Sequence, residues 1–107
     1  DMRRAMAFGM AVVDSSMRCA CLRGADLTKA KLRDTDLSGA DMLMTNLASA
    51  DLSGSKLRMA NLARANLRDA VLTDVALDGA HLHETIVSEP SAELFTRRQL
   101  QGAIIVA

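Results

Sequence analysis

Residues 20–84 read ACLRG ADLTK AKLRD TDLSG ADMLM TNLAS ADLSG SKLRM ANLAR ANLRD AVLTD VALDG AHLHE, thirteen blocks of five without an insertion. The third position of each block is Leu, except for Met42. The first position is Ala in nine blocks and otherwise Thr, Ser or Val, and the second is Asp or Asn in seven. The fold therefore follows from a tandem repeat with a period of five.

A period of five matches neither a helix nor a plain strand. Residues five apart lie about 140° apart around a helix. In a strand, which alternates every two residues, an odd period would put successive leucines on opposite faces. Each block therefore needs a turn that resets the direction of the chain. The small first residue and the leucine then both point inward, while the other three residues point outward and make the corner. Asp and Asn at the second position suit such a corner, because their side chains hydrogen-bond nearby backbone.

This A-[DN]-L-x-x pattern resembles the pentapeptide-repeat proteins over residues 20–84. The resemblance implies an all-β fold, a right-handed quadrilateral parallel β-helix with four repeats per coil. A coil of twenty residues would stack the third positions into four buried columns. Val75 is the one oversized residue at a first position, so we expect local adjustment there. The predicted structural core is Leu22, Leu27, Leu32, Leu37, Met42, Leu47, Leu52, Leu57, Leu62, Leu67, Leu72, Leu77 and Leu82.

The length of 107 residues indicates a single domain, residues 1–107. Within it, we interpret residues 1–19 as degenerate repeats or an N-terminal cap, since the frame continues weakly upstream. Residues 20–88 form the regular repeats, and residues 89–107 form a C-terminal α-helical cap and a tail.

The C-terminal cap is expected because a solenoid exposes its core at each end. The pattern breaks at Ser88-Glu89-Pro90, and Thr96 with Gln99 matches a helix capping box. We predict a short helix over 91–102, followed by another repeat out of frame or by a terminal strand. Bare strand edges at either end would favour a homodimer through a solenoid end.

Composition excludes several classes of partner. Thirteen basic and thirteen acidic residues give a net charge of zero, which argues against general nucleic-acid binding. Aromatic residues make up 2% of the chain, so a base-stacking platform is missing. No run of about 18 apolar residues exists that would cross a membrane. We therefore expect a protein partner, no nucleic acid and no membrane.

The outward charges are expected to pair between coils, which adds a few tenths of a kcal/mol per pair. Adding twenty to a position finds its neighbour one coil further. The expected pairs are Lys31 with Asp51, Asp36 with Lys56, Arg58 with Asp78, and Arg64 with Glu84.

The sequence offers no catalytic constellation, and we expect no enzyme activity, cofactor or metal. His81, His83 and Glu84 could together hold a metal, but their outward positions near a solenoid end favour a solvated polar face. Cys19 and Cys21 lie too close in sequence for normal disulfide geometry in a strand, and we interpret them as two partly buried thiols.

Exposed apolar residues give the only candidate contact site. Leu43, Met44 and Met59 occupy outward positions that are polar in most blocks. Adjacent exposed apolar groups can mark a contact with a partner, so these three residues are the predicted partner-contact site.

These features favour a non-catalytic, rigid scaffold for protein–protein interaction. One alternative is an accessory structural domain of a longer protein, because the chain opens with Asp1 and its repeat pattern is open at the C-terminal end. Another is a DNA-mimicking binder of a type II topoisomerase, as in the quinolone-resistance members of the family, which neutral charge disfavours. We expect a soluble, cytoplasmic protein; the resemblance also allows secretion or the chloroplast lumen.

Overall fold

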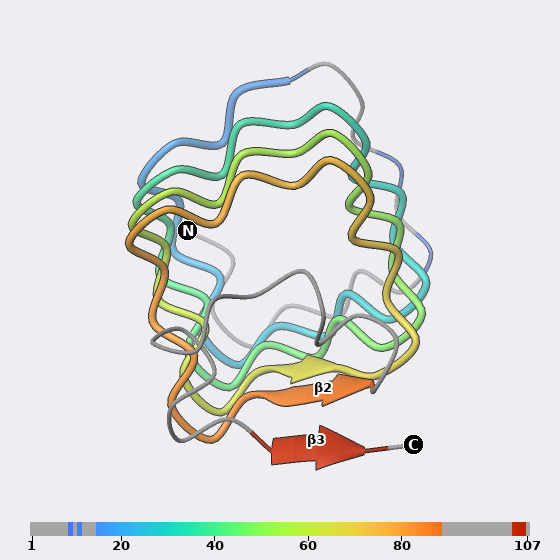
Figure 1. Cartoon of the computed structure of the whole chain (residues 1–107). Coiled ribbons are helices and arrows are strands. Elements are labelled where there is room, and N and C mark those ends of the chain that lie inside the picture. The colour runs from blue at the N-terminus through green and yellow to red at the C-terminus, as the bar shows by residue number, and fades with distance from the viewer. Residues whose placement is uncertain (1–8, 10, 12–14, 89–103, 107) are drawn as a thin grey trace.

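The chain winds into stacked coils, as Figure 1 shows in a view into the stack, and the bridge register gives twenty residues to each coil. The computed structural model describes Gly9, Ala11, residues 15–88 and the backbone of residues 104–106. Parallel bridges join residues twenty apart, for example Asp26 to Asn46 and Asp51 to Val71. Twenty residues are four blocks, so the predicted β-helix with four repeats per coil is confirmed.

Each block lies on one of four faces, and blocks on the same face stack directly. Face 1 comprises residues 20–24, 40–44, 60–64 and 80–84; face 2 comprises 25–29, 45–49, 65–69 and 85–88; face 3 comprises 30–34, 50–54 and 70–74; and face 4 comprises 15–19, 35–39, 55–59 and 75–79. The register extends upstream of the first complete block, since Ala11 pairs with Lys31 and Ser16 with Asp36.

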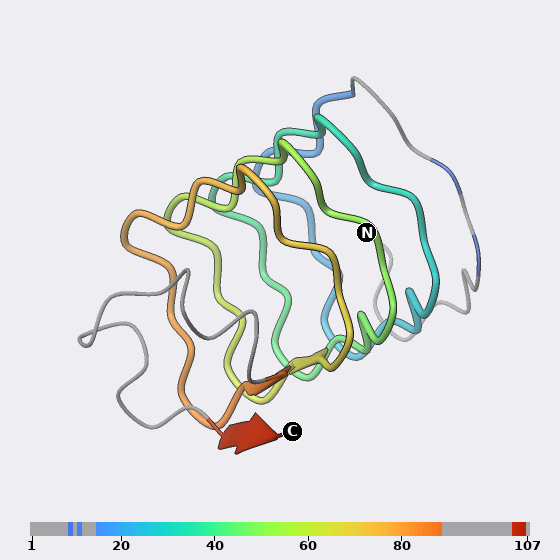
Figure 2. The same cartoon turned by 45° about the vertical axis from the view of Figure 1, so that its right-hand side comes forward.

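Three short strands form one parallel sheet in the order β1-β2-β3. They are β1 (Asn66–Leu67), β2 (Ile86–Ser88) and β3 (Ile104–Val106). Asn66 pairs with Ile86 across twenty residues, but Ile86 pairs with Ile104 across eighteen. In Figures 1 and 2, β3 lies alongside β2 as the next layer of face 2. A terminal strand was one of the two expectations here, whereas the predicted helix over 91–102 falls outside the described residues.

The backbone is hydrogen-bonded from coil to coil at three positions of a block. On face 3, the Leu32 N–H donates to the Asp51 carbonyl at 2.8 Å and the Asp34 N–H donates to the Ser53 carbonyl at 2.9 Å. The Asp51 N–H donates in the other direction, to the Ala30 carbonyl at 2.9 Å. Figure 2 shows the resulting stack from the side. Each block is thereby fixed by its neighbours in the adjacent coils.

The corner of each block is a four-residue turn. The first-position N–H of the next block donates to the third-position carbonyl, as from Ala50 to Leu47 at 3.0 Å. The fifth residue has a positive φ, between 54° and 71°, in every block from Cys19 to Glu84. Glycine occupies four of these fourteen positions, and none of the other ten residues is β-branched. The left-handed backbone explains both facts, since a branched Cβ is most strained there.

All seven Asp and Asn residues at the second position stabilise the corner that follows them. They lie in the bridge before the corner, and their Oδ1 accepts the backbone N–H of the fourth residue. This geometry refines the predicted role in the corner, and it is the Asx-turn that these side chains favour. The acceptors are Asp26, Asp36, Asp41, Asn46, Asp51, Asn61 and Asn66, with distances of 3.0–3.2 Å.

The predicted core is buried throughout. All thirteen third-position side chains are at most 6% exposed, and Val87 extends one of their columns. The hydroxyls of buried Thr45 and Thr85 donate to the Leu22 and Leu62 carbonyls of the preceding coil, at 2.7 and 2.6 Å. Val75 is only half-buried, and its turn hydrogen bond to Leu72 is stretched to 3.3 Å, which is the expected adjustment.

Among the described residues, no helix is long and apolar enough to span a membrane.

Candidate functional site

The predicted contact residues lie along two edges of face 1. Met44 and Met59 are 55% and 65% exposed, while Leu43 is half-buried. Met44 is the corner between faces 1 and 2, and Met59 is the corner between faces 4 and 1. The structure therefore keeps Leu43 and Met44 together and separates Met59 from them by the width of one face.

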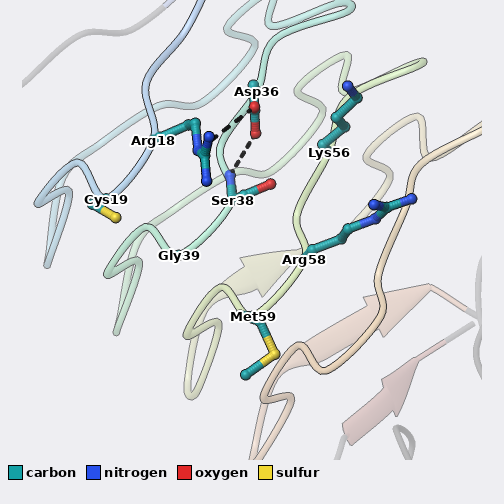
Figure 3. Close-up of a pocket in the computed structure, with 8 residues that line it drawn as sticks. All are labelled: Arg18, Cys19, Asp36, Ser38, Gly39, Lys56, Arg58 and Met59. Carbon is teal, nitrogen blue, oxygen red and sulfur yellow. Dashed lines mark hydrogen bonds and ion pairs between the residues drawn. The ribbon is translucent and has the colours of Figure 1, made fainter.

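Met59 instead forms part of a shallow hollow of about 390 Å³ on face 4 (Figure 3). The register creates this hollow, because small residues at the fourth and fifth positions of one coil lie between larger residues of the coils on either side. Ser38 and Gly39 form the middle of the hollow, where little side chain fills the space. The lining residues are Arg18, Cys19, Asp36, Ser38, Gly39, Lys56, Arg58 and Met59.

The corner beside the hollow alternates between sulfur-containing residues and glycine. Its successive fifth positions are Cys19, Gly39, Met59 and Gly79. A Cβ at Gly39 would lie 3.2 Å from Cys19 Sγ, and a Cβ at Gly79 would overlap with Met59 Sδ. Each glycine therefore accommodates the side chain of the preceding coil, and the Met59 thioether lies against Gly79.

Asp36 is the one carboxylate in the lining. Its Oδ1 accepts the Ser38 N–H at 3.0 Å, and its Oδ2 lies 3.9 Å from Arg18 Nε. The Ser38 hydroxyl lowers the pKa of Asp36 most, followed by the Ser38 N–H, with smaller contributions from the charges of Arg18 and Lys56. Asp36 is therefore ionised at neutral pH and engaged on both of its oxygens.

The two basic residues of the 55–59 block are less engaged. Arg58 Nε lies 3.6 Å from an Asp78 carboxylate outside the lining. Lys56 makes no ion pair within 4 Å to any residue of the described part of the chain. Figure 3 shows both side chains extending away from Ser38 and Gly39, whereas Arg18 turns toward Asp36. Their cationic groups thus lie exposed at the side of the hollow away from Ser38 and Gly39.

Two of the four predicted cross-coil ion pairs form. Arg58 pairs with Asp78 at 3.6 Å and Arg64 with Glu84 at 2.9 Å. The expected pairs of Lys31 with Asp51 and of Lys56 with Asp36 do not come within 4 Å.

Arginine takes the place of lysine on these carboxylates, in a diagonal arrangement. Asp51 pairs with Arg33 at 3.7 Å, Asp41 pairs with Arg23 at 2.8 Å, and Asp36 pairs with Arg18. Because Oδ1 of each aspartate is bound to the N–H of its fourth residue, the carboxylate faces the column of fourth positions, where the arginines lie.

Among the described cysteines and histidines, Cys19 alone lines the hollow. Cys19 is an exposed free thiol and not the partly buried one that the sequence predicts, because it stands at a corner; Cys21 is half-buried, as predicted. His83 Nε2 lies 3.4 Å from Glu84, which also accepts from Arg64. Within residues 15–88, no three His, Cys, Asp or Glu side chains are grouped as a metal site would require.

Sequence reasoning missed the hollow and one exposed apolar residue. Val71, 45% exposed, stands at a second position where Asp or Asn is usual. The hollow could have been found by writing the sequence in rows of twenty, which aligns Ser38-Gly39 with Arg18-Cys19 and Arg58-Met59.

A family model described as pentapeptide repeats matches residues 20–42 and 45–83, with eight copies. This is more than half of the chain, and the coils have the geometry that its repeats require. The chain belongs to the pentapeptide repeat family. No curated protein matches it.

Solved structures of the same family resemble the chain. A pentapeptide repeat protein from Nostoc PCC 7120, alr5209, is 30% identical with a TM-score of 0.76, and the match covers 96% of this chain and 82% of that one. A pentapeptide repeat protein from the Arabidopsis thaliana thylakoid lumen is 18% identical with a TM-score of 0.59, covering 78% and 65%. QnrB1, a plasmid-mediated fluoroquinolone resistance protein, is 16% identical with a TM-score of 0.57, covering 82% and 52%. The last two likenesses concern the fold alone.

Proposed function

We propose that this chain is a non-catalytic scaffold that binds a protein partner through the side chains on its outer faces. The exposure of Met44 and Met59 is the observation that carries the proposal. Methionine is flexible and polarisable, and it adapts well to a partner surface. An exposed methionine at a fixed point of a rigid surface is a favourable anchor for such contacts.

The backbone at both methionines is hydrogen-bonded to the next coil. The Met44 N–H donates to the Ala63 carbonyl at 3.0 Å, and the Met59 N–H donates to the Asp78 carbonyl at 2.9 Å. Binding there requires little ordering of the backbone, which reduces the entropic penalty of association.

Binding to a type II topoisomerase as a DNA mimic is a weaker candidate. A mimic needs the charge density of a duplex, whereas this chain has a net charge of zero. The likeness to QnrB1, at 16% identity, adds no support beyond the fold.

A crosslinked pull-down from a lysate of the expressing cells tests the scaffold. The baits are the native chain and the Leu43→Glu/Met44→Glu variant. We expect a partner that the native chain retains and that the variant loses by at least about tenfold, since two carboxylates would be desolvated against it.

The matched control is Ala48→Glu/Ser49→Glu, which adds the same charges at the same two block positions on face 2. Retention of the partner by this control would place the contact at Leu43 and Met44. Equal recovery on all three baits, or no partner on any, would contradict the proposed contact and favour an accessory structural role.

A further inference from the structure

The tripeptide Lys-Leu-Arg occurs twice in the chain at the same block positions. Lys31 and Arg33 stand on face 3, and Lys56 and Arg58 stand on face 4. In both cases the leucine is buried and the two basic residues are exposed. The two sites therefore differ only in what surrounds them.

On face 3, carboxylates balance the two positive charges. Arg33 Nε lies 3.7 Å from Asp51 Oδ2. The pKa of Asp51 is lowered mainly by the Ser53 hydroxyl, but the charges of Arg33 and Lys31 both add to the effect. The next residue along the chain is a second carboxylate, Asp34. An incoming anion would meet a site that is already neutral.

On face 4, the same tripeptide borders the hollow. The fifth residue of its block is Met59, and the neighbouring coil presents Ser38 and Gly39. Three cations, from Arg18, Lys56 and Arg58, line this space together with one carboxylate, Asp36. The lining thus carries a surplus of positive charge in a chain whose net charge is zero.

The carboxylates near this site do not neutralise it. Asp36 is engaged by Ser38 and Arg18. Asp78 contacts Arg58 at 3.6 Å, but the Asp78 side chain is 84% exposed, so solvent screens this pair. Asp78 therefore competes only weakly with a ligand carboxylate for Arg58.

We propose that the hollow on face 4 binds an acidic segment of a protein partner. Lys56 and Arg58 hold a carboxylate of that segment at the side of the hollow away from Ser38 and Gly39, and Met59 contacts an apolar residue beside it. The proposal rests on the scaffold function proposed above and adds the chemistry of the partner. Arginine suits this role because its guanidinium can bind both oxygens of a carboxylate.

Fluorescence anisotropy with a labelled octapeptide of alternating Glu and Leu tests this site on the full chain. We expect Lys56→Ala/Arg58→Ala to weaken binding about tenfold, and the matched control Lys31→Ala/Arg33→Ala to weaken it less than about twofold. An octapeptide of alternating Gln and Leu should bind neither variant nor the native chain. Raising the salt concentration should weaken binding of the Glu peptide, because exposed charges are screened.

A second variant separates the site from a folding defect. Asp78→Asn removes the competing partner of Arg58, and we expect the Glu peptide to bind about threefold more tightly. A gain in affinity cannot come from loss of structure.

Equal losses in the two Lys-Arg variants, or no gain with Asp78→Asn, would overturn the proposal. So would preferential binding of an eight-nucleotide oligothymidylate that is lost in Lys56→Ala/Arg58→Ala, since the hollow would then take phosphate. In the pull-down, a partner retained by Lys56→Ala/Arg58→Ala but lost by Leu43→Glu/Met44→Glu would preserve the scaffold and reject this site.

Discussion

The fifth residue of each block adopts the left-handed backbone that turns the chain onto the next face. Ten such residues are not glycine, including Met44, Ser49 and Met59. A side chain in this region is strained by about 1 kcal/mol or more. The exposure of the two methionines is thus set by the backbone, because a corner side chain projects from the edge between two faces.

Ser49 offers a direct measurement of this strain. Its φ is 58° and its side chain is exposed. We expect Ser49→Val to lower the free energy of unfolding by about 1–2 kcal/mol, because a β-branched residue fits the left-handed region worst. Chemical denaturation gives the value.

Ala48→Val is the matched control for Ser49→Val. It places the same side chain at a fourth position, where Thr28 and Thr73 show that β-branched residues fit. A loss at least as large in Ala48→Val as in Ser49→Val would show that added bulk, and not the backbone, is responsible.

The left-handed position leaves its own signal in the sequence, separate from the spacing of the leucines. Four of the chain's six glycines fall at fifth positions, namely Gly24, Gly39, Gly54 and Gly79. The other fifth positions hold residues as different as Lys29 and Met59, which hides the pattern. The absence of β-branched residues is the more general signal, because it reflects steric exclusion.

Three corners combine an aspartate with a hydroxyl two residues later. Thr28 donates to Asp26 through both its hydroxyl, at 2.6 Å, and its N–H, at 3.1 Å. Ser53 binds Asp51 in the same way, and the Ser38 N–H donates to Asp36 at 3.0 Å. In all three cases the hydroxyl is the main cause that lowers the pKa of the carboxylate. The ionised carboxylate is therefore part of the folded corner.

These corners predict loss of stability in acid. A carboxyl whose pKa is lower in the folded state stabilises the fold fully above its unfolded pKa, which is about 3.9. That contribution is lost as the pH falls through the folded pKa. We expect the free energy of unfolding, from urea titrations, to fall as the pH drops from about 5 to below 3.

The variant Asp26→Asn/Asp36→Asn/Asp51→Asn should show a smaller fall over the same range. Asparagine keeps the acceptor oxygen but does not titrate, and Asn46, Asn61 and Asn66 already fill this position in other blocks. An equal fall in the native chain and the variant would refute the role of these three carboxylates.

The core of the whole molecule is four columns in which each leucine contacts those of the adjacent coils. Leu52 is fully buried, between Leu32 and Leu72 in its column. We expect Leu52→Ala to lower the free energy of unfolding by about 3 kcal/mol, since a central coil cannot collapse around the cavity. Thermal or urea unfolding measures it.

Leu52→Met is the control, because Met42 already occupies a third position with 0% exposure. It should lower the free energy of unfolding by less than about 1.5 kcal/mol. A similar loss in both variants would mean that the column does not accommodate changes of shape, contrary to the place of Met42.

The sequence predicts the buried positions of this molecule far better than the contacts of its exposed side chains. The strict spacing from Leu22 to Leu82 fixes the inward positions, and the resemblance to the pentapeptide-repeat proteins implies the four blocks per coil and thereby the buried columns. Outward contacts depend on the rotation of side chains, which a period does not encode. Asp51 was therefore assigned to Lys31, while its Asx turn directs it to Arg33. The hollow was missed for the same reason, since it arises from the sizes of residues in three coils at once.

The step of eighteen residues between β2 and β3 departs from the twenty-residue register of the coils before it. Counted in blocks of five, Ile105 occupies a first position, yet it pairs with the third-position Val87. If the blocks were counted on through β3 as in residues 20–84, their corners would lie two residues away from the corners of face 2. The five-residue phase of residues 20–88 therefore does not carry through β3, and a coil that followed β3 would need a new starting residue for its blocks to keep its corners in line with face 2.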